Sequence, residues 1–226
     1  MNLGWAQAWR VGATVILIIG WAVAAHLGSA GAGSVDLNAA VALTPVLVAL
    51  AVLLWQARSR WLFCAGLFGA VGAIWALWPQ LRQNVSLLYY LQHLGSHLAL
   101  AVFFGRTLRG NRDALITSMA RFIYGDALSV RKVRYTRQVT LAWTVFFVAN
   151  ALVSTGLFLW APAAVWSVHA NLLTGPLMGL MFLGEHLIRL RVLPPHERPS
   201  VAEVVRAYRQ RVQQAAPARR PAGPEA

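Results

Sequence analysis

Long apolar runs, separated by short polar segments, occupy most of the first 192 residues of the chain. A helix needs about 20 mostly apolar residues to cross the hydrocarbon core of a bilayer. Six runs meet or nearly meet this length, which predicts an all-α polytopic membrane protein with a six-span bundle over residues 1–192. The predicted spans cover residues 11–27, 37–55, 61–78, 87–105, 139–160 and 163–184.

The basic residues are distributed unequally between the loops that these six spans define. Nineteen of the twenty lysines and arginines fall on one side of the membrane, and only Arg82 falls on the other. Positive charge is enriched in cytoplasmic loops, so the asymmetry predicts that the N- and C-termini are both cytoplasmic. An odd number of spans would separate the two most basic segments.

The first span has some features of a signal peptide, with Arg10 ahead of an apolar stretch that ends in small residues. Its apolar run is long for the core of a signal peptide, and few charges precede it. We therefore favour an uncleaved anchor. In the third span, Gly66, Gly69 and Gly72 are spaced so that a neighbouring helix can approach closely.

The predicted cytoplasmic loop 106–138 contains an amphipathic segment. Asn111 or Asp113 is placed to cap a short helix that runs to about Tyr124 and is ended by Gly125. Two interpretations stay open for this helix. It lies on the inner membrane surface through its apolar face, or it is a connector that docks on the bundle.

A basic surface is predicted just before the fifth span. Its residues are Arg131, Lys132, Arg134 and Arg137. Basic side chains at this position act as topology signals and contact anionic headgroups. A specific anionic ligand is the alternative.

The segment after the sixth span is predicted to leave the membrane. Residues 193–213 form a predicted cytoplasmic amphipathic helix, in which Ser200 and Glu203 have the spacing of a capping box. Residues 214–226 are rich in proline and alanine, which predicts a disordered tail.

Polar side chains gather in the predicted outer half of the membrane. His93 and His97 are four residues apart, so they share one helical face. The predicted direction of the spans brings further polar residues to the same depth. The resulting set is a candidate ligand site or polar cavity: His26, Tyr90, His93, His97, His169 and Asn171.

Three interpretations of these histidines compete. Neutral imidazoles can hydrogen-bond between helices and stabilise the bundle. They can instead line a cavity that binds a ligand or relays protons, because imidazole titrates near neutral pH. Histidines at this spacing can also ligate a metal or haem iron, although the nearest carboxylate is Asp36 in an outer loop. We predict no metal site.

A second polar group lies at the inner end of the sixth span and consists of Glu185, His186 and Arg189. Glu185 and Arg189 are spaced as an i,i+4 pair, which indicates a structural ion pair at the interface. The sequence contains no nucleophile elbow, phosphate loop, dinucleotide fingerprint or zinc-protease motif. The sequence therefore nominates no catalytic residue and favours a non-catalytic role, with a membrane enzyme as the open alternative.

The stretch from Val133 to Arg189 resembles a poorly characterised family of small bacterial inner-membrane proteins. These proteins accompany gene clusters for aryl-polyene and xanthomonadin-type pigments. The residues that carry the resemblance are Tyr135, Thr136, Arg137, Trp143, Phe146, Phe147, Asn171, Gly184 and Glu185. The resemblance implies a multi-pass protein of the bacterial inner membrane that helps to make or move a polyene acyl lipid.

These observations together predict an accessory component of aryl-polyene-type lipid or pigment biosynthesis or transport. The alternatives are a small-molecule or proton-coupled transporter, and a haem- or metal-binding redox membrane protein that uses the outer histidines. The chain has a net charge of +13 and is 58% hydrophobic, so we expect a lipid bilayer rather than nucleic acid as partner. An acyl carrier protein is a candidate partner for the basic cytoplasmic face. The sequence names no cofactor.

Overall fold

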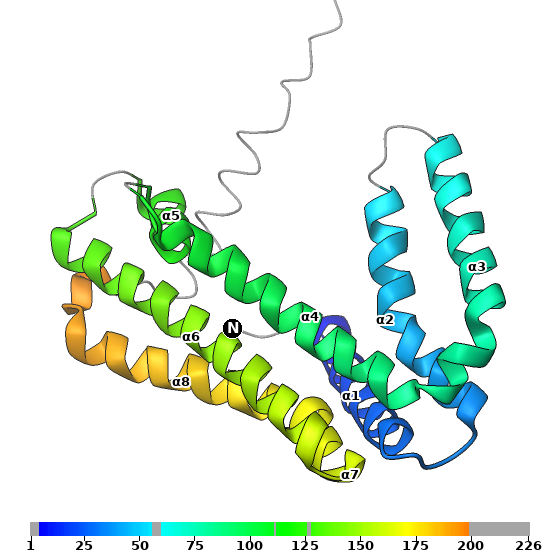
Figure 1. The fold of residues 1–226 in the computed structure, drawn as a ribbon. Helices are drawn as coiled ribbons and strands as arrows, with labels where there is room; N and C mark the ends of the chain where they lie inside the picture. The colour runs from blue at the N-terminus through cyan, green and yellow to red at the C-terminus, as the bar shows by residue number, and fades with distance from the viewer. Residues whose placement is uncertain (1–4, 56–59, 111, 126–127, 199–226) are drawn as a thin grey trace, which may run out of the picture. The chain divides into compact units, whose positions relative to one another are not determined.

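The computed structural model describes residues 5–55, 60–110, 112–125 and 128–198, and these residues form helices and connecting turns without any strand (Figure 1). This confirms the predicted all-α fold. In chain order the elements are α1 (Trp5–Ser29), α2 (Val35–Trp55), α3 (Arg60–Gln83), α4 (Val85–Gly105), η1 (Arg106–Leu108), α5 (Leu115–Tyr124), α6 (Val130–Trp160), α7 (Ala163–Ser167), η2 (Val168–Leu173), α8 (Thr174–Val192) and η3 (Pro195–Glu197).

Five of the described helices are long and apolar enough to cross a membrane. They are α1, α2, α3, α4 and α6, and they coincide with the first five predicted spans. Their apolar side chains largely face outward; Ile16 is 70% exposed and Phe68 is 77% exposed. Such surfaces suit a hydrocarbon solvent and would be unfavourable in water. The chain therefore has the architecture of a multi-pass membrane protein.

The sixth predicted span is a continuous helical run divided into α7, η2 and α8. The η2 segment is a π-helix, in which the backbone N–H of Thr174 donates to the carbonyl of His169 five residues earlier. Pro176 lies three residues after the end of η2 and has no N–H for the carbonyl four residues before it, so the hydrogen-bond register changes in this region. The division leaves the count of six spans a prediction.

The described helices belong to two compact units. Unit 1 contains residues up to Leu100 together with Phe146–Leu180, and unit 2 contains Ala101–Val145 and the chain from Met181 onward. Helices α4, α6 and α8 therefore contribute different parts of their length to each unit.

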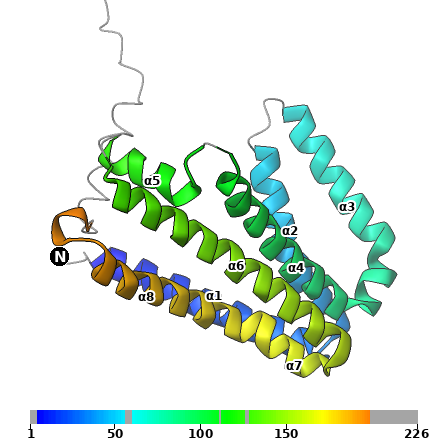
Figure 2. The same cartoon turned by 60° about the vertical axis from the view of Figure 1, so that its left-hand side comes forward.

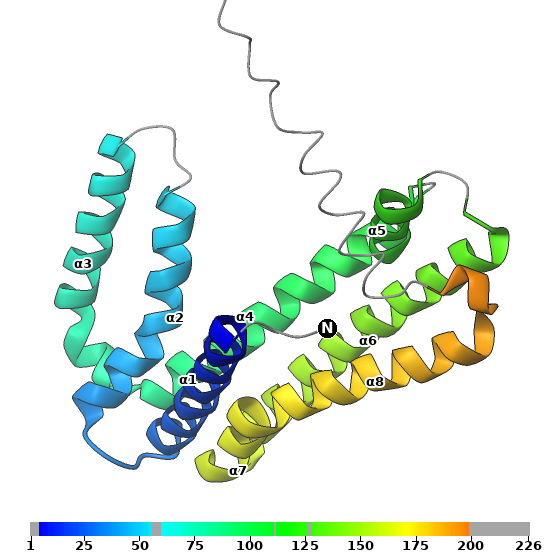
Figure 3. The same cartoon turned by 180° about the vertical axis from the view of Figure 1, so that it is seen from behind.

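In unit 1, α2 and α3 form an antiparallel hairpin (Figures 1 and 3). A Cβ atom on Gly66 would lie 2.7 Å from the Leu54 side chain, so the missing side chain permits this approach. Gly69 and Gly72 have open space around them, and the predicted close contact therefore holds for Gly66 alone. At the other end of the hairpin, Asp36 accepts a hydrogen bond from Trp78 Nε1 at 3.2 Å.

The core of unit 1 forms around Trp166, which is fully buried. Its neighbours in the buried cluster are Ala25, Ala42, Tyr89 and Ala170. Small residues on the other elements make room for the indole ring. Its Nε1–H donates to the hydroxyl of Ser154 at 3.0 Å, so the one polar atom of the ring is paired inside the core.

In unit 2, α5 packs on α6 through buried threonines. Thr117 and Thr136 join their hydroxyl groups at 2.7 Å, and the backbone N–H of Ile116 donates to Thr140 Oγ1 at 3.2 Å. The connector interpretation is therefore confirmed. Met119 and Phe122 are exposed on α5, which leaves an apolar face for a membrane surface as well. Figure 2 shows α5 against the first part of α6.

The prediction for the N-terminal cap of α5 is wrong, and the prediction for its C-terminal end is confirmed. Ala114 precedes the first helical residue, and no side chain caps the N-terminus. The carboxylate of Asp113 instead pairs with Arg121 at 2.5 Å, while Asn111 lies outside the described residues. Gly125 ends the helix with a φ of 76°, which glycine adopts without strain.

Two predicted boundaries change. Helix α6 begins at Val130, so the last part of the predicted loop 106–138 is the first part of this helix. Within the segment 193–213, where a tail helix is predicted, the described residues contain only the short 3₁₀ turn η3. Residues 199–213 and the predicted tail 214–226 lie outside the described residues.

We expect Trp166→Phe to lower the stability of the purified protein by about 1 kcal/mol, because Ser154 then loses its buried donor. Thermal unfolding in detergent measures this change. Trp160 is 84% exposed, so Trp160→Phe is the matched control and should unfold like the wild type. Equal unfolding of both variants would contradict the role of this hydrogen bond.

Candidate functional site

Three histidine rings meet in unit 1. His93 and His97 lie one turn apart on α4, and their ring centroids are 4.1 Å apart. His169 from η2 approaches His93 with a centroid distance of 5.8 Å and the rings nearly perpendicular. We call these three residues the histidine cluster. The shared face of α4 follows from sequence spacing, whereas the approach of His169 follows from tertiary packing.

The hydroxyl of Thr174 connects the two helices of the cluster. It donates to the carbonyl of His169 at 3.0 Å, a contact five residues back along the chain that the π-helical register permits. The same oxygen lies 3.1 Å from His93 Nε2. Thr174 therefore supports the π segment and orients the His93 ring at once.

These contacts assign the protons of the imidazole rings. Because the Thr174 hydrogen is used on His169, its oxygen accepts from His93 Nε2–H. His97 Nδ1 lies 2.8 Å from the carbonyl of His93, which only accepts, so Nδ1 of His97 carries its proton. His169 makes a hydrogen bond with the backbone of Asn150.

Each ring of the cluster has one further buried nitrogen without a hydrogen-bond partner among the described residues. These atoms are His93 Nδ1, His97 Nε2 and His169 Nε2. His97 is 5% exposed and His169 is 7% exposed, whereas His93 is half-buried. In neutral imidazole the nitrogen without a proton is a hydrogen-bond acceptor. For His93 and His97 the assigned protons make the unpartnered atom that acceptor.

The other residues of the predicted outer site have partners of their own. His26 Nδ1 lies 2.7 Å from the Ser167 hydroxyl, and the Asn171 amide donates to Ser29 at 3.0 Å. These two contacts join α1 to the segment α7–η2.

Tyr90 also has a partner away from the histidine cluster. Its hydroxyl lies 3.1 Å from Thr155 Oγ1, and its ring stacks on Phe158 with centroids 4.1 Å apart. The structure thus separates three helix-joining contacts from the histidine cluster.

The described residues contain no group of three histidines, cysteines or carboxylates that is arranged to hold one metal ion. Asp36, the carboxylate considered from the sequence, lies 3.4 Å from Arg82 and also accepts from Trp78. Its charge is thus compensated within the α2–α3 hairpin.

Thr174 positions the histidine cluster, Ser167 bonds to His26 and Ser154 bonds to Trp166, and the sequence prediction missed all three hydroxyl groups. Hydroxyl side chains are common in membrane helices, where many bond only to their own backbone, so their presence alone gives little signal. One available clue is that Thr174 stands beside Gly175 and Pro176, because a proline within a helix commonly marks a kink.

A separate polar group lies in unit 2 at the end of α8. The predicted ion pair is present, with Arg189 Nη2 3.5 Å from Glu185 Oε2. The hydroxyl of Tyr135 donates to the other carboxylate oxygen at 2.7 Å. Arg189 also contacts His186 Nδ1 at 3.1 Å. Glu185 thereby joins the start of α6 to α8, which is a structural role.

The predicted basic surface is wrong for one of its four residues. Arg131, Arg134 and Arg137 are exposed, and Arg137 donates to the carbonyl of Leu108 at 2.7 Å. Lys132 is buried instead, with its ammonium group 3.5 Å from the centroid of the Tyr124 ring. A lysine among four basic residues gives no sequence signal for this cation–π contact.

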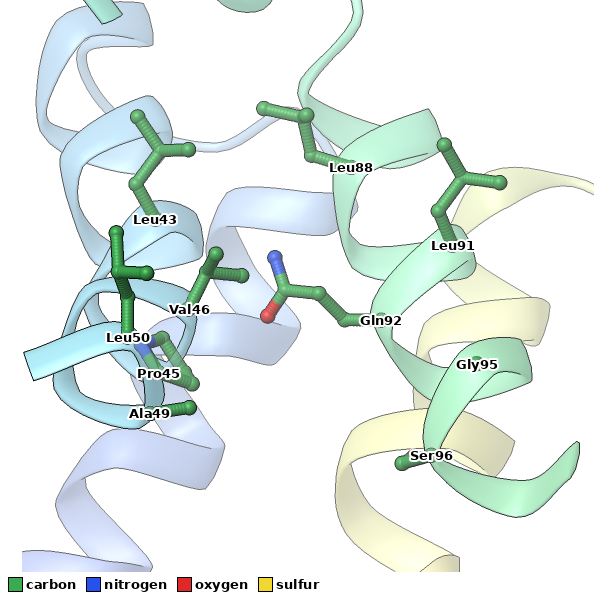
Figure 4. A pocket seen from close by; sticks show the side chains of 10 residues that line it. All are labelled: Leu43, Pro45, Val46, Ala49, Leu50, Leu88, Leu91, Gln92, Gly95 and Ser96. Atoms are coloured by element: carbon green, nitrogen blue, oxygen red, sulfur yellow. The ribbon is translucent and has the colours of Figure 1, made fainter. Parts of the chain in front are cut away.

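An apolar groove of about 730 Å³ lies between α2 and α4 in unit 1 (Figure 4). Its walls are formed by Leu43, Pro45, Val46, Ala49, Leu50, Leu88, Leu91, Gln92, Gly95 and Ser96. Gln92 extends from α4 toward α2, and its amide donates to the carbonyl of Ala42 at 2.7 Å. The most polar side chain at the groove is therefore already paired.

Comparison with protein families, with curated proteins and with solved structures gives no match to this chain.

The proton assignment predicts different tautomers on neighbouring rings. His97 should be protonated on Nδ1 and His93 on Nε2, as read from ¹⁵N chemical shifts of histidine-labelled protein in bilayers. Thr174→Val should shift the His93 signals and lower the stability of the protein by about 1 kcal/mol, because the Nε2–H of His93 then has no acceptor. Thr44 bonds only to its own helix backbone, so Thr44→Val is the control. An Nε2-protonated His97 would contradict the assignment.

Proposed function

We propose that this chain is a lipid-handling accessory protein of the bacterial inner membrane, without catalytic activity of its own. The ligand is the apolar acyl or polyene chain of a lipid, bound in the groove between α2 and α4. The groove is the observation that carries this proposal. The resemblance of the carboxy-terminal half to proteins of aryl-polyene pigment clusters supports a role in making or moving a polyene lipid.

The dimensions of the groove suit a single hydrocarbon chain. Its α4 wall extends from Leu88 to Ser96, a rise of about 12 Å at 1.5 Å per residue. That length approaches the thickness of one leaflet, roughly 15 Å. A volume of about 730 Å³ lies within the usual range of small-molecule sites.

Small residues line both walls of the groove. On α4, no atom lies within 4 Å of the place where a Cβ of Gly95 would stand, and on α2 the groove is lined by Ala49. Both walls belong to helices that are long and apolar enough to span a membrane. The medium around the groove is therefore hydrocarbon, and a lipid chain enters without leaving an apolar environment.

We expect Ala49→Phe to fill the groove and to reduce co-purifying lipid several-fold, because the ring occupies the space of the bound chain. Mass spectrometry of lipids bound to protein from the native membrane measures this. Ala40 is exposed on α2 but does not line the groove, so Ala40→Phe is the matched control. If Ala49→Phe co-purifies with as much lipid as the wild type, the groove is not the lipid-binding site. Absence of polyene acyl chains among the wild-type lipids would refute the pathway assignment.

The exposed arginines favour an acidic partner at the cytoplasmic face, and we propose an acyl carrier protein. Arg131 and Arg134 are both exposed on the first turns of α6. Arg131→Gln combined with Arg134→Gln should weaken capture of an acyl carrier protein about tenfold at low salt. Pull-down at low and moderate salt measures this, and Arg10→Gln on α1 is the control. Association that is insensitive to both salt and the double substitution would contradict this partner.

A further inference from the structure

The histidine cluster offers hydrogen-bond acceptors rather than donors. The Nδ1–H of His97 and the Nε2–H of His93 are both used on protein acceptors. The buried nitrogens without a partner among the described residues therefore present lone pairs at these two rings. His169 Nε2 is a third buried nitrogen without a partner among the described residues, on the ring next to His93. An unsatisfied buried acceptor is unfavourable, so a ligand that donates a hydrogen bond is stabilised there.

We propose that His93, His97 and His169 form a binding site for the hydroxyl group of a membrane-soluble alcohol. The site does not depend on the lipid groove, because the groove residues of α4 and the two histidines lie on different faces of that helix. The alcohol donates its O–H to an imidazole lone pair, and its apolar part stays in hydrocarbon.

The chemistry of the cluster selects against other ligand classes. An ether of the same length has no hydrogen to donate, so it leaves the acceptors unpaired. A carboxylate brings a negative charge toward lone pairs. The segments of α6 and α8 within unit 1 carry no basic side chain to compensate it. Selectivity for the alcohol over both analogues is thus the signature of this site.

The surroundings of the cluster fit an apolar ligand with one polar end. Phe147 places its ring edge-on to His97 with centroids 6.0 Å apart. His93 is half-buried as a residue, while its unpartnered Nδ1 is itself buried. Its Nε2 lies 3.1 Å from the hydroxyl of Thr174. A shared metal ion would require rings that converge on one point, and the described residues are not so arranged.

Histidine-labelled full-length protein in lipid nanodiscs tests the proposal with three probes of equal chain length: decanol, methyl decyl ether and decanoate. Decanol should shift the ¹⁵N signals of the unprotonated cluster nitrogens saturably. The ether and the carboxylate should bind roughly tenfold more weakly or not at all. This comparison uses the wild-type chain and therefore does not depend on the folding of a variant.

Variants place the response at the cluster. His97→Phe should abolish the saturable decanol response of the remaining cluster histidines, while His186→Phe at the end of α8 should leave it intact. An equal response to decanol and its ether, or no saturable response to decanol, would overturn the proposal. A cluster that retains stoichiometric Zn²⁺ after purification would also overturn it. A negative result here would not contradict the proposal that lipid binds in the groove. A negative result with Ala49→Phe would likewise not contradict the alcohol site.

Discussion

The pairing of polar groups inside apolar surroundings is the constraint on which this structure depends. A membrane helix satisfies its own backbone, but each interruption of that pattern needs a partner from elsewhere. Pro176 creates such an interruption, and the segment before it has π-helical register. The Thr174 hydroxyl bonds to the carbonyl of His169 in this segment and lies 3.1 Å from His93 Nε2, so one side chain joins the π segment to the histidine cluster.

Short polar side chains pair buried polar groups in both units. Ser154 pairs the indole of Trp166 in unit 1, and Thr117 pairs with Thr136 in unit 2. Hydroxyl groups are small enough to let helices approach while still supplying a donor and an acceptor. Larger apolar side chains can then face outward toward lipid. This explains why the described helices bury so few large residues.

Helix α4 combines two surfaces with opposite chemistry. One face has Leu88, Leu91 and Gly95 and forms a wall of the apolar groove. The other face presents His93 and His97, whose rings contact each other and whose remaining nitrogens have no hydrogen-bond partner among the described residues. A helix with a single apolar stripe would have only one of these surfaces. Helix α4 therefore carries the groove-lining residues and the two histidines on different faces.

The sequence alone determined the helical fold and the position of five helices that are long and apolar enough to cross a membrane, because length and apolarity act locally along the chain. It also predicted the end of α5 at Gly125, the Glu185–Arg189 pair and the shared face of His93 and His97, since these depend on spacing within one helix. It misplaced the start of α5 and the environment of Lys132, where residues from other elements compete for the side chain.

Only the tertiary structure decided which polar residues meet. Six candidates had been grouped by depth, yet His169 joins His93 and His97 while His26, Tyr90 and Asn171 bond to hydroxyl side chains. Depth constrains position along the membrane normal but leaves rotation about each helix axis free. That rotation is set by packing around Trp166 and by the π turn before Pro176, which no local pattern specifies.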